Sequence, residues 1–271
     1  MTTRLPASLA VLACLASPSI GAAQTLTLPS TPLAQSVTPT IADVPTATPF
    51  RAPKADGFWA PFTAVPRDFA NFMSLDTAKL LGVASGAALV ASRWDSHLME
   101  EAQENLPASR FKAGNFAGQF LVQMGAGFGV YAFAKATGNE EISALGGDLL
   151  RAQMLSQGIV QAGKLAARRQ RPDGSNSASM PSGHTASAFA TAGVLQRHYG
   201  WKVGIPAYGF GAYVAASRMS ANKHNLSDVL VGAAIGMASA HTVTIGRGGA
   251  KFGMGVAPTV GGAAIMFTKK N

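Results

Sequence analysis

The chain has 271 residues, of which 48% are hydrophobic and only 13% are charged, about half the charged fraction of a typical soluble domain. This length suits one domain of ordinary size with tails. The net charge is +9, but no aromatic residues are interleaved with the basic cluster, so we do not expect a nucleic-acid partner.

The first 23 residues have the pattern of a secretory signal peptide. Arg4 supplies a positive charge, Leu5 to Ala16 form an apolar stretch, and Gly21-Ala22-Ala23 provides the small residues of a cleavage site. We therefore expect an exported, periplasmic protein. Cys14, the single cysteine, lies inside this segment, so the mature chain should contain neither thiols nor disulfides. A lipoprotein-type cleavage site at Cys14 is the alternative.

Beyond the signal peptide, the pattern changes twice. Residues 24–60 are rich in Pro, Thr and Ser, which predicts a flexible leader. Residues 61–246 show apolar segments separated by Gly, Pro and polar breaks, which predicts an all-α domain, a compact helical bundle. The tail 247–271 has a candidate short β-hairpin around Gly261-Gly262. The helices are expected at 66–73, 75–92, 95–105, 115–136, 141–168, 184–199, 202–217 and 226–245.

Two of the expected helices raise the question of a membrane. Segments 115–134 and 228–246 reach the length of a span, yet each contains polar or ionisable side chains that also suit a buried helix. We expect a soluble or membrane-associated exported protein, with an integral inner-membrane protein as the alternative.

The first cluster of chemically capable side chains ends the long helix at 141–168. Lys164, Arg168 and Arg171 follow i, i+4, i+7 spacing and would share one face if the helix continued. Their mutual repulsion is easier to understand if an anion lies between them. Pro172 disfavours helical geometry at Arg171, so Arg171 should lie at the helix end. A basic helix end that complements the macrodipole is the structural alternative.

The second cluster is Pro181-Ser182-Gly183-His184, just before an apolar helical run. Ser182 is expected to cap that helix, and Gly183 allows the backbone to approach a ligand closely. The free N–H groups of a helix start can bind an anion, and His184 at its edge could donate a proton.

In the third cluster, Ser217-Arg218 is followed by His224 and Asp228. The i, i+4 spacing predicts that the Asp228 carboxylate accepts a hydrogen bond from one imidazole nitrogen and leaves the other as a nucleophile. His184, His224 and Asp228 could alternatively bind zinc, but the neighbouring cations would repel a dication. A phosphate fits the set better.

Together the three clusters resemble the motif of the type 2 phosphatidic acid phosphatase (PAP2) superfamily. This superfamily includes bacterial class A acid phosphatases, membrane lipid phosphatases and vanadium haloperoxidases. The motif is Lys, six residues, Arg-Pro; then Pro-Ser-Gly-His; then Ser-Arg, five residues, His, three residues, Asp. Residues 164–228 contain every specified position in order and with the required spacing.

The resemblance implies a role for each matching residue. His224 resembles the nucleophile that forms a phosphohistidine, Asp228 the carboxylate that orients it, and His184 the general acid. The implied phosphate-binding residues are Lys164, Arg171, Ser182, Gly183 and Arg218. No metal or other cofactor is implied, although vanadate could occupy the phosphate site. Arg168 and Arg169 fall at unspecified positions, and no role is assigned to them.

The sequence therefore predicts an exported, metal-independent phosphatase for phosphomonoesters or for lipid phosphates and pyrophosphates. Its partner is a phosphorylated small molecule or lipid, and membrane association and oligomeric state are open. The alternatives are a vanadate-dependent oxidoreductase resembling the haloperoxidases, and a catalytically silent membrane or binding protein on the same scaffold.

Overall fold

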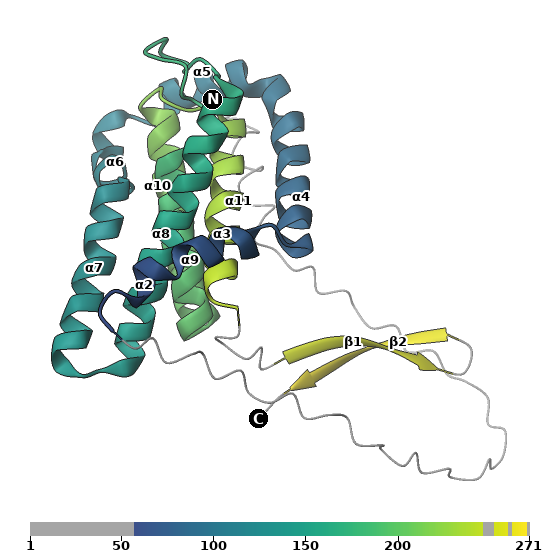
Figure 1. The fold of residues 1–271 in the computed structure, drawn as a ribbon. Helices are drawn as coiled ribbons and strands as arrows, with labels where there is room; N and C mark the ends of the chain where they lie inside the picture. Colours follow the sequence, from purple (N-terminus) through teal and green to yellow (C-terminus); the bar gives the residue numbers. More distant parts are fainter. Residues whose placement is uncertain (1–56, 246–251, 260–261, 270–271) are drawn as a thin grey trace, which may run out of the picture. The chain divides into compact units, whose positions relative to one another are not determined.

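The computed structural model describes residues 57–245, 252–259 and 262–269, and the predicted all-α fold is confirmed (Figure 1). The predicted signal peptide and almost all of the predicted leader lie outside the described residues. The elements are α2 (Ala60–Thr63), α3 (Val65–Phe72), α4 (Leu75–Ala91), η1 (Ser92–Trp94), α5 (Asp95–Asn105), η2 (Ala108–Phe111), α6 (Lys112–Ala117), α7 (Phe120–Thr137), α8 (Glu140–Ala167), α9 (Gly183–Tyr199), α10 (Trp201–Ser220), α11 (Leu226–Val243), β1 (Phe252–Thr259) and β2 (Gly262–Lys269).

Short polar residues set several helix boundaries. Ser74 and Asn139 cap α4 and α8 by accepting a main-chain N–H of the first turn through their side chains. Asn225 and Asp228 form a reciprocal capping box at the start of α11. Gly138 ends α7 in the left-handed conformation, with φ at 69°, which glycine adopts without strain.

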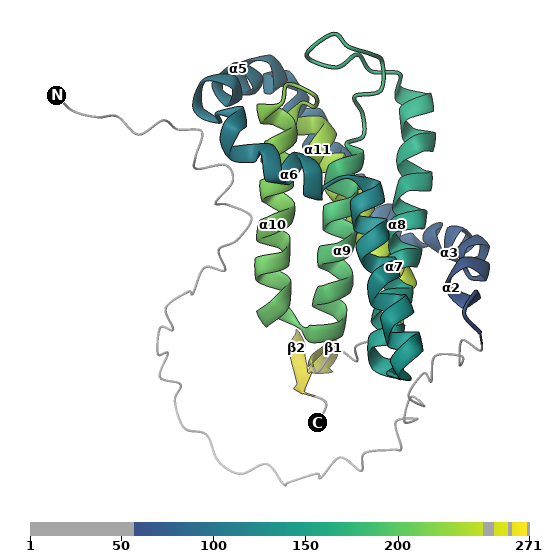
Figure 2. The same ribbon diagram turned by 90° about the vertical axis from the view of Figure 1, so that its left-hand side faces the viewer.

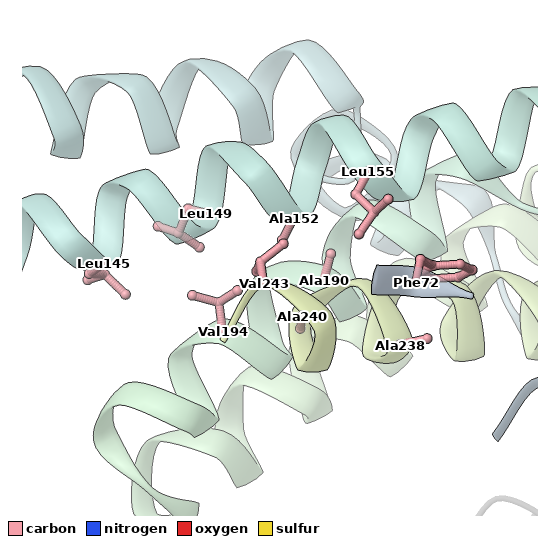
Figure 3. Packing of buried hydrophobic residues seen from close by; sticks show 10 residues of the cluster. All are labelled: Phe72, Leu145, Leu149, Ala152, Leu155, Ala190, Val194, Ala238, Ala240 and Val243. Atoms are coloured by element: carbon pink, nitrogen blue, oxygen red, sulfur yellow. The ribbon is translucent and has the colours of Figure 1, made fainter. Parts of the chain in front are cut away.

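The core lies where α8 packs against α9 and α11, and α3 covers one side of it (Figure 3). Small residues let these helices approach closely. A Cβ on Gly236 of α11 would lie 2.3 Å from the Ala186 carbonyl oxygen of α9, so only glycine fits this crossing. The main cluster consists of Phe72, Leu145, Leu149, Ala152, Leu155, Ala190, Val194, Ala238, Ala240 and Val243.

The prediction of one continuous helix over 115–136 is wrong. The segment is divided into α6 and α7, and Gln119 between them is extended, with φ −64° and ψ 137°. The physical reason is tertiary. Gly118 passes so close to α9 and α10 that a Cβ there would lie 2.5 Å from Val214 and 3.3 Å from His184. The break brings α6 against the start of α9.

Large apolar side chains are exposed along several helices. Two stretches, Leu75–Asn105 and Leu226–Val243, are long and apolar enough to cross a membrane, but they differ in burial. Leu226–Val243 is mostly buried in the core, whereas only 11% of the apolar window in Leu75–Asn105 is buried. Exposed apolar residues of α4, α7 and α10 are Leu75, Val83, Leu89, Val90, Leu121, Phe128, Phe133, Trp201, Val203, Ile205 and Phe210.

The predicted C-terminal hairpin is present. Strands β1 and β2 pair antiparallel, with Phe252 opposite Lys269 and Thr259 opposite Gly262. Strand β2 begins at Gly262, one of the two glycines around which the sequence indicates the turn.

Candidate active site

The predicted site residues gather at one end of the helical bundle. The loop between α8 and α9 and the turn between α10 and α11 both lie at this end (Figures 1 and 2). Lys164 stands in the last turn of α8, His184 in the first turn of α9, and Arg218 in the last turn of α10. Arg171 lies in the α8–α9 loop and His224 lies just before α11.

The helix does not continue far enough for Lys164, Arg168 and Arg171 to share one face. Helix α8 ends at Ala167, and Arg168 adopts the left-handed conformation with φ at 44°. Arg168 is therefore exposed and turned out of the helix. Arg171 lies in the loop, where its main-chain N–H donates to Asn176 at 2.9 Å. The loop, rather than a helical face, brings Arg171 to the site.

His184 is partly buried among cations. Burial and the charges of Arg218, Arg171 and Lys164 lower its pKa to about 4, although a hydrogen bond to the Asn115 backbone acts in the opposite direction. His184 is therefore neutral at neutral pH. Because a main-chain carbonyl accepts a hydrogen bond, the imidazole nitrogen that faces Asn115 carries the proton.

The predicted hydrogen bond between His224 and Asp228 does not form. The His224 Nδ1 lies 3.9 Å from Asp228 Oδ2, too far for a hydrogen bond. It lies instead 2.6 Å from the main-chain oxygen of Ser179. Since this oxygen only accepts, Nδ1 carries the proton and Nε2 keeps its lone pair.

Burial and the same three cations also determine the charge of His224. The side chain is 2% exposed. Burial, followed by the charges of Arg218, Lys164 and Arg171, lowers the pKa of His224 far below its usual value. The imidazole is therefore neutral across the physiological pH range, which is the state that a nitrogen nucleophile needs.

Asp228 acts on His224 through Ser179. Its Oδ2 accepts a hydrogen bond from the Ser179 hydroxyl at 2.6 Å and from the main-chain N–H of Asn225 at 2.8 Å. Its Oδ1 accepts from Arg169 Nη1 at 2.8 Å. Asp228 is thus fully buried and paired with Arg169, and Ser179 links it to the imidazole of His224.

Three cations, Lys164, Arg171 and Arg218, lie close enough to act on one another, while Asp228 acts on Lys164 and Asp173 acts on Arg218 in the opposite direction. Burial and the Arg171 charge lower the pKa of Lys164 to about 8, and burial with Arg171 lowers that of Arg218 to about 10. Among the described residues, the buried Nε atoms of Arg171 and Arg218 have no hydrogen-bond partner. Buried donors are normally satisfied, so this arrangement is suited to a multiply charged oxyanion.

The start of α9 differs from the expectation in one detail. The Ser182 side chain does not cap the helix; its hydroxyl lies 2.9 Å from the Thr185 hydroxyl, and its main-chain N–H donates to the Asp228 carbonyl at 3.0 Å. Gly183 begins the helix, so its N–H is one of the first-turn groups without an intrahelical acceptor. This end of α9 remains suited to an anion.

Four residues of the site were missed by sequence reasoning. Ser179 holds His224, and Arg169 holds Asp228. Asp95 of α5 pairs with Arg169 at 2.8 Å, and Asn115 of α6 accepts a hydrogen bond from Arg218 through its side chain. The Asn-x-x-Asp pattern at 225–228 signals the capping box, but no local pattern signals these four contacts.

A resident metal has no evident set of ligands in the described part of the chain. No group of three or more His, Cys, Asp or Glu side chains is placed to hold a metal ion there. Three cations, Lys164, Arg171 and Arg218, act on both histidines of the site, and such cations bind oxyanions and repel metal ions.

Known proteins resemble the part of the chain that carries this site. A family model of the PAP2 superfamily matches residues 146–250. The Lipid A 1-phosphatase of Porphyromonas gingivalis is 40% identical over 115 residues, which are 41% of this chain and 24% of that protein. The Lipid A 4'-phosphatase of Helicobacter pylori is 28% identical over 109 residues, which are 36% of this chain and 55% of that protein.

A solved structure also resembles the chain. The crystal structure of Aquifex aeolicus LpxE has a TM-score of 0.45 and 22% sequence identity, and the match covers 56% of this chain and 93% of that one. The matches to the two curated relatives span only about a quarter and about half of their lengths.

Proposed function

Because the chain belongs to the PAP2 superfamily, we propose that it is a metal-independent phosphatase that hydrolyses a phosphorylated lipid through a phosphohistidine at His224. The observation that carries this proposal is the pairing of His224 Nδ1 with the Ser179 carbonyl oxygen at 2.6 Å. This contact assigns the proton to Nδ1 and leaves Nε2 as the free nucleophile.

In the first step, the lone pair of His224 Nε2 attacks phosphorus. The bond between phosphorus and the ester oxygen breaks, and the departing oxygen takes a proton from His184 in its imidazolium form. In the second step, neutral His184 takes a proton from water while the water oxygen attacks phosphorus. The P–N bond breaks, which releases inorganic phosphate and restores neutral His224.

The cations around the two histidines support this chemistry. Phosphoryl transfer depends mainly on positioning and on stabilisation of charge on the three equatorial oxygens. Lys164, Arg171 and Arg218 each lower the pKa of both His184 and His224, so all three act on the same small volume. We assign the equatorial oxygens to these cations, together with the first N–H groups of α9.

A lipid substrate is supported by two independent features. Both curated relatives are named as phosphatases of lipid A, a glycolipid whose phosphates are attached to sugar. Helices α4, α7 and α10 carry many exposed large apolar side chains, which suit contact with lipid chains. A glycolipid phosphate presented at a membrane surface fits both features.

We place the protein outside the cytoplasm, at the membrane. The N-terminal signal-peptide pattern supports export, and the exposed apolar residues of α4, including Val83 at 75% and Leu89 at 70% exposure, support contact with lipid. Recovery of the protein in the washed membrane fraction would agree with this placement. Recovery in the soluble periplasmic fraction would contradict it.

The test of the mechanism is substitution of the nucleophile. We expect His224→Ala to abolish release of phosphate from lipid A and to prevent trapping of labelled phosphate on the protein. The matched control is His97→Ala, because His97 is exposed on α5 and pairs only with Glu101 at 3.6 Å. Near wild-type hydrolysis by His224→Ala would refute the mechanism.

The choice between substrate classes needs a parallel assay. Lipid A, phosphatidate and p-nitrophenyl phosphate should be compared at equal enzyme concentration. We expect the largest kcat/KM for lipid A. A larger value for the soluble ester would contradict the lipid assignment without affecting the proposed nucleophile.

A further inference from the structure

Asp95 is a buried carboxylate that reaches the site from outside the segment matched by the family model. It begins α5, far from residues 146–250 in sequence, and is 4% exposed. Its oxygens accept hydrogen bonds from Arg169 Nη2 at 2.8 Å, from the Ser227 hydroxyl at 2.5 Å and from the Ser227 N–H at 3.1 Å. A carboxylate this deeply buried requires such pairing.

Arg169 joins Asp95 to the residues behind the nucleophile. Its guanidinium bridges two carboxylates, since Nη1 donates to Asp228 at 2.8 Å and Nη2 donates to Asp95. Its main-chain oxygen accepts the N–H of Ser179 at 2.9 Å. The same residue therefore holds Asp228 with its side chain and Ser179 with its backbone.

The contacts continue without interruption to the imidazole. Asp228 accepts from the Ser179 hydroxyl at 2.6 Å, and the Ser179 carbonyl oxygen accepts from His224 Nδ1 at 2.6 Å. Because Arg169 occupies the other Asp228 oxygen, the carboxylate is held away from the ring at 3.9 Å. Every link in this series constrains the direction of His224 Nε2.

We propose that Arg169 and Asp95 are positioning residues for His224, acting through Asp228 and Ser179. This inference rests on the proposed phosphatase function. Arg169 differs in role from the phosphate-binding cations. The charges that lower the pKa of His184 and His224 are those of Lys164, Arg171 and Arg218, and Arg169 is not among them. Arg169 should therefore affect the chemical step and leave anion binding intact.

The surroundings of Arg169 allow a specific test of this role. Its side chain is 31% exposed, and it lines two hollows of about 500 Å³ each. One hollow lies against α5 and includes Asp95, and the other includes Met180 and Ser227. Removal of the side chain should leave a space that a guanidinium ion can enter from solvent.

The experiment compares Arg169→Ala with Arg168→Ala, its exposed neighbour. Hydrolysis of p-nitrophenyl phosphate gives kcat and KM, and calorimetry with sulfate measures the affinity of the anion site. For Arg169→Ala we expect kcat to fall roughly tenfold to 100-fold, as misplacement of a reacting group predicts, with KM and sulfate affinity unchanged. Guanidinium chloride at non-denaturing concentration should restore activity. Arg168→Ala should match the wild type.

Asp95→Asn provides a second variant that keeps the side-chain volume. It places an amide N–H₂ against the donors of Arg169 and Ser227, so we expect lower kcat with unchanged sulfate affinity. This variant decides the question if Arg169→Ala does not fold.

Three outcomes would overturn the inference. Wild-type kcat in Arg169→Ala or in Asp95→Asn would show that the network does not position His224. Loss of sulfate affinity together with failure of guanidinium to restore activity would indicate a structural role alone. A wild-type protein that hydrolyses no phosphoester would overturn the proposed function, and this inference with it, so the two failures are distinguishable.

Discussion

Anion binding at the site should draw a proton onto His184. Burial and the charges of Arg218, Arg171 and Lys164 lower its pKa to about 4, against about 6.5 for an unperturbed histidine. At pH 6, about one molecule in a hundred therefore carries the His184 proton. A general acid must be protonated before it can donate, so the bound substrate has to reverse this shift.

The size of the reversal follows from Coulomb's law. One negative charge about 4 Å from a titrating group, at an effective dielectric constant of about 20, contributes about 4 kcal/mol, or about 3 pKa units. The pKa of His184 in the complex would then be near 7. At pH 6 we expect an uptake of about 0.9 proton for each anion bound.

At pH 6, two features assign the proton uptake to His184. Lys164, with a pKa of about 8, is already protonated at pH 6 and takes up no further proton. The pKa of His224 is depressed much further than that of His184 by its deeper burial, so His224 stays largely neutral. Sulfate is a suitable probe because it is a tetrahedral dianion that does not itself titrate near neutral pH.

The assay is calorimetric titration with sulfate at pH 6 in two buffers with different ionisation enthalpies. The dependence of the binding enthalpy on the buffer gives the number of protons taken up. His184→Gln is the control, since glutamine cannot take up the proton. Uptake near zero in the wild type, or equal uptake in His184→Gln, would refute the reasoning.

The rise in the pKa of His184 on anion binding should also appear in the pH profiles of kcat and kcat/KM. Because kcat/KM reports the free enzyme, its decrease with rising pH should begin at the low pKa of His184, near 4. The decrease of kcat reports the complex, so we expect it at a pH about 3 units higher.

Two further substitutions test the surroundings of the site. Asn115→Leu removes the side-chain oxygen that accepts a hydrogen bond from Arg218. Loss of a hydrogen bond to a charged group should weaken sulfate binding roughly tenfold. The pH profile assigned to His184 should remain, because the imidazole of His184 donates to the main chain of Asn115 and not to its side chain. Gly236→Ala places a methyl group 2.3 Å from a carbonyl oxygen of α9. We expect this overpacking to reduce the free energy of unfolding by about 1–3 kcal/mol, measured by denaturant titration. Gly209→Ala, which has open space, should cost far less. An unchanged sulfate affinity in the first variant, or unchanged stability in the second, would contradict these assignments.

Local pattern was sufficient for most of the helices and for naming the candidate site residues. Helices such as α4 and α8 begin and end within a residue of their predicted bounds, because Ser74 and Asn139 cap their starts from adjacent positions in the sequence. The spacing of Lys164, Arg171, His184, Arg218 and His224 indicated them as candidate site residues, and in the structure the three cations lie close enough to lower the pKa of both histidines.

Errors arose where distant segments compete with local preference. The segment 115–136 reads as one helix, yet Gly118 must pass against Val214 and His184, and the helix breaks there. The i, i+4 spacing of His224 and Asp228 suggests direct contact, but Asp228 is committed to Arg169 and to the capping of α11.

The amino-acid order alone therefore specifies which side chains are available for phosphate chemistry, since motif spacing and helix signals are local properties. Which partner each of them meets depends on the packed bundle. Asp95 and Ser227 are 132 positions apart, and Asn115 and Arg218 are 103 positions apart. Such contacts form only when α5 and α6 dock against α10 and α11, because burial then forces each polar group to find a partner. The α8–α9 loop likewise meets the residues before α11 only in the folded chain, and this contact places the Ser179 carbonyl oxygen against Nδ1 of the proposed nucleophile.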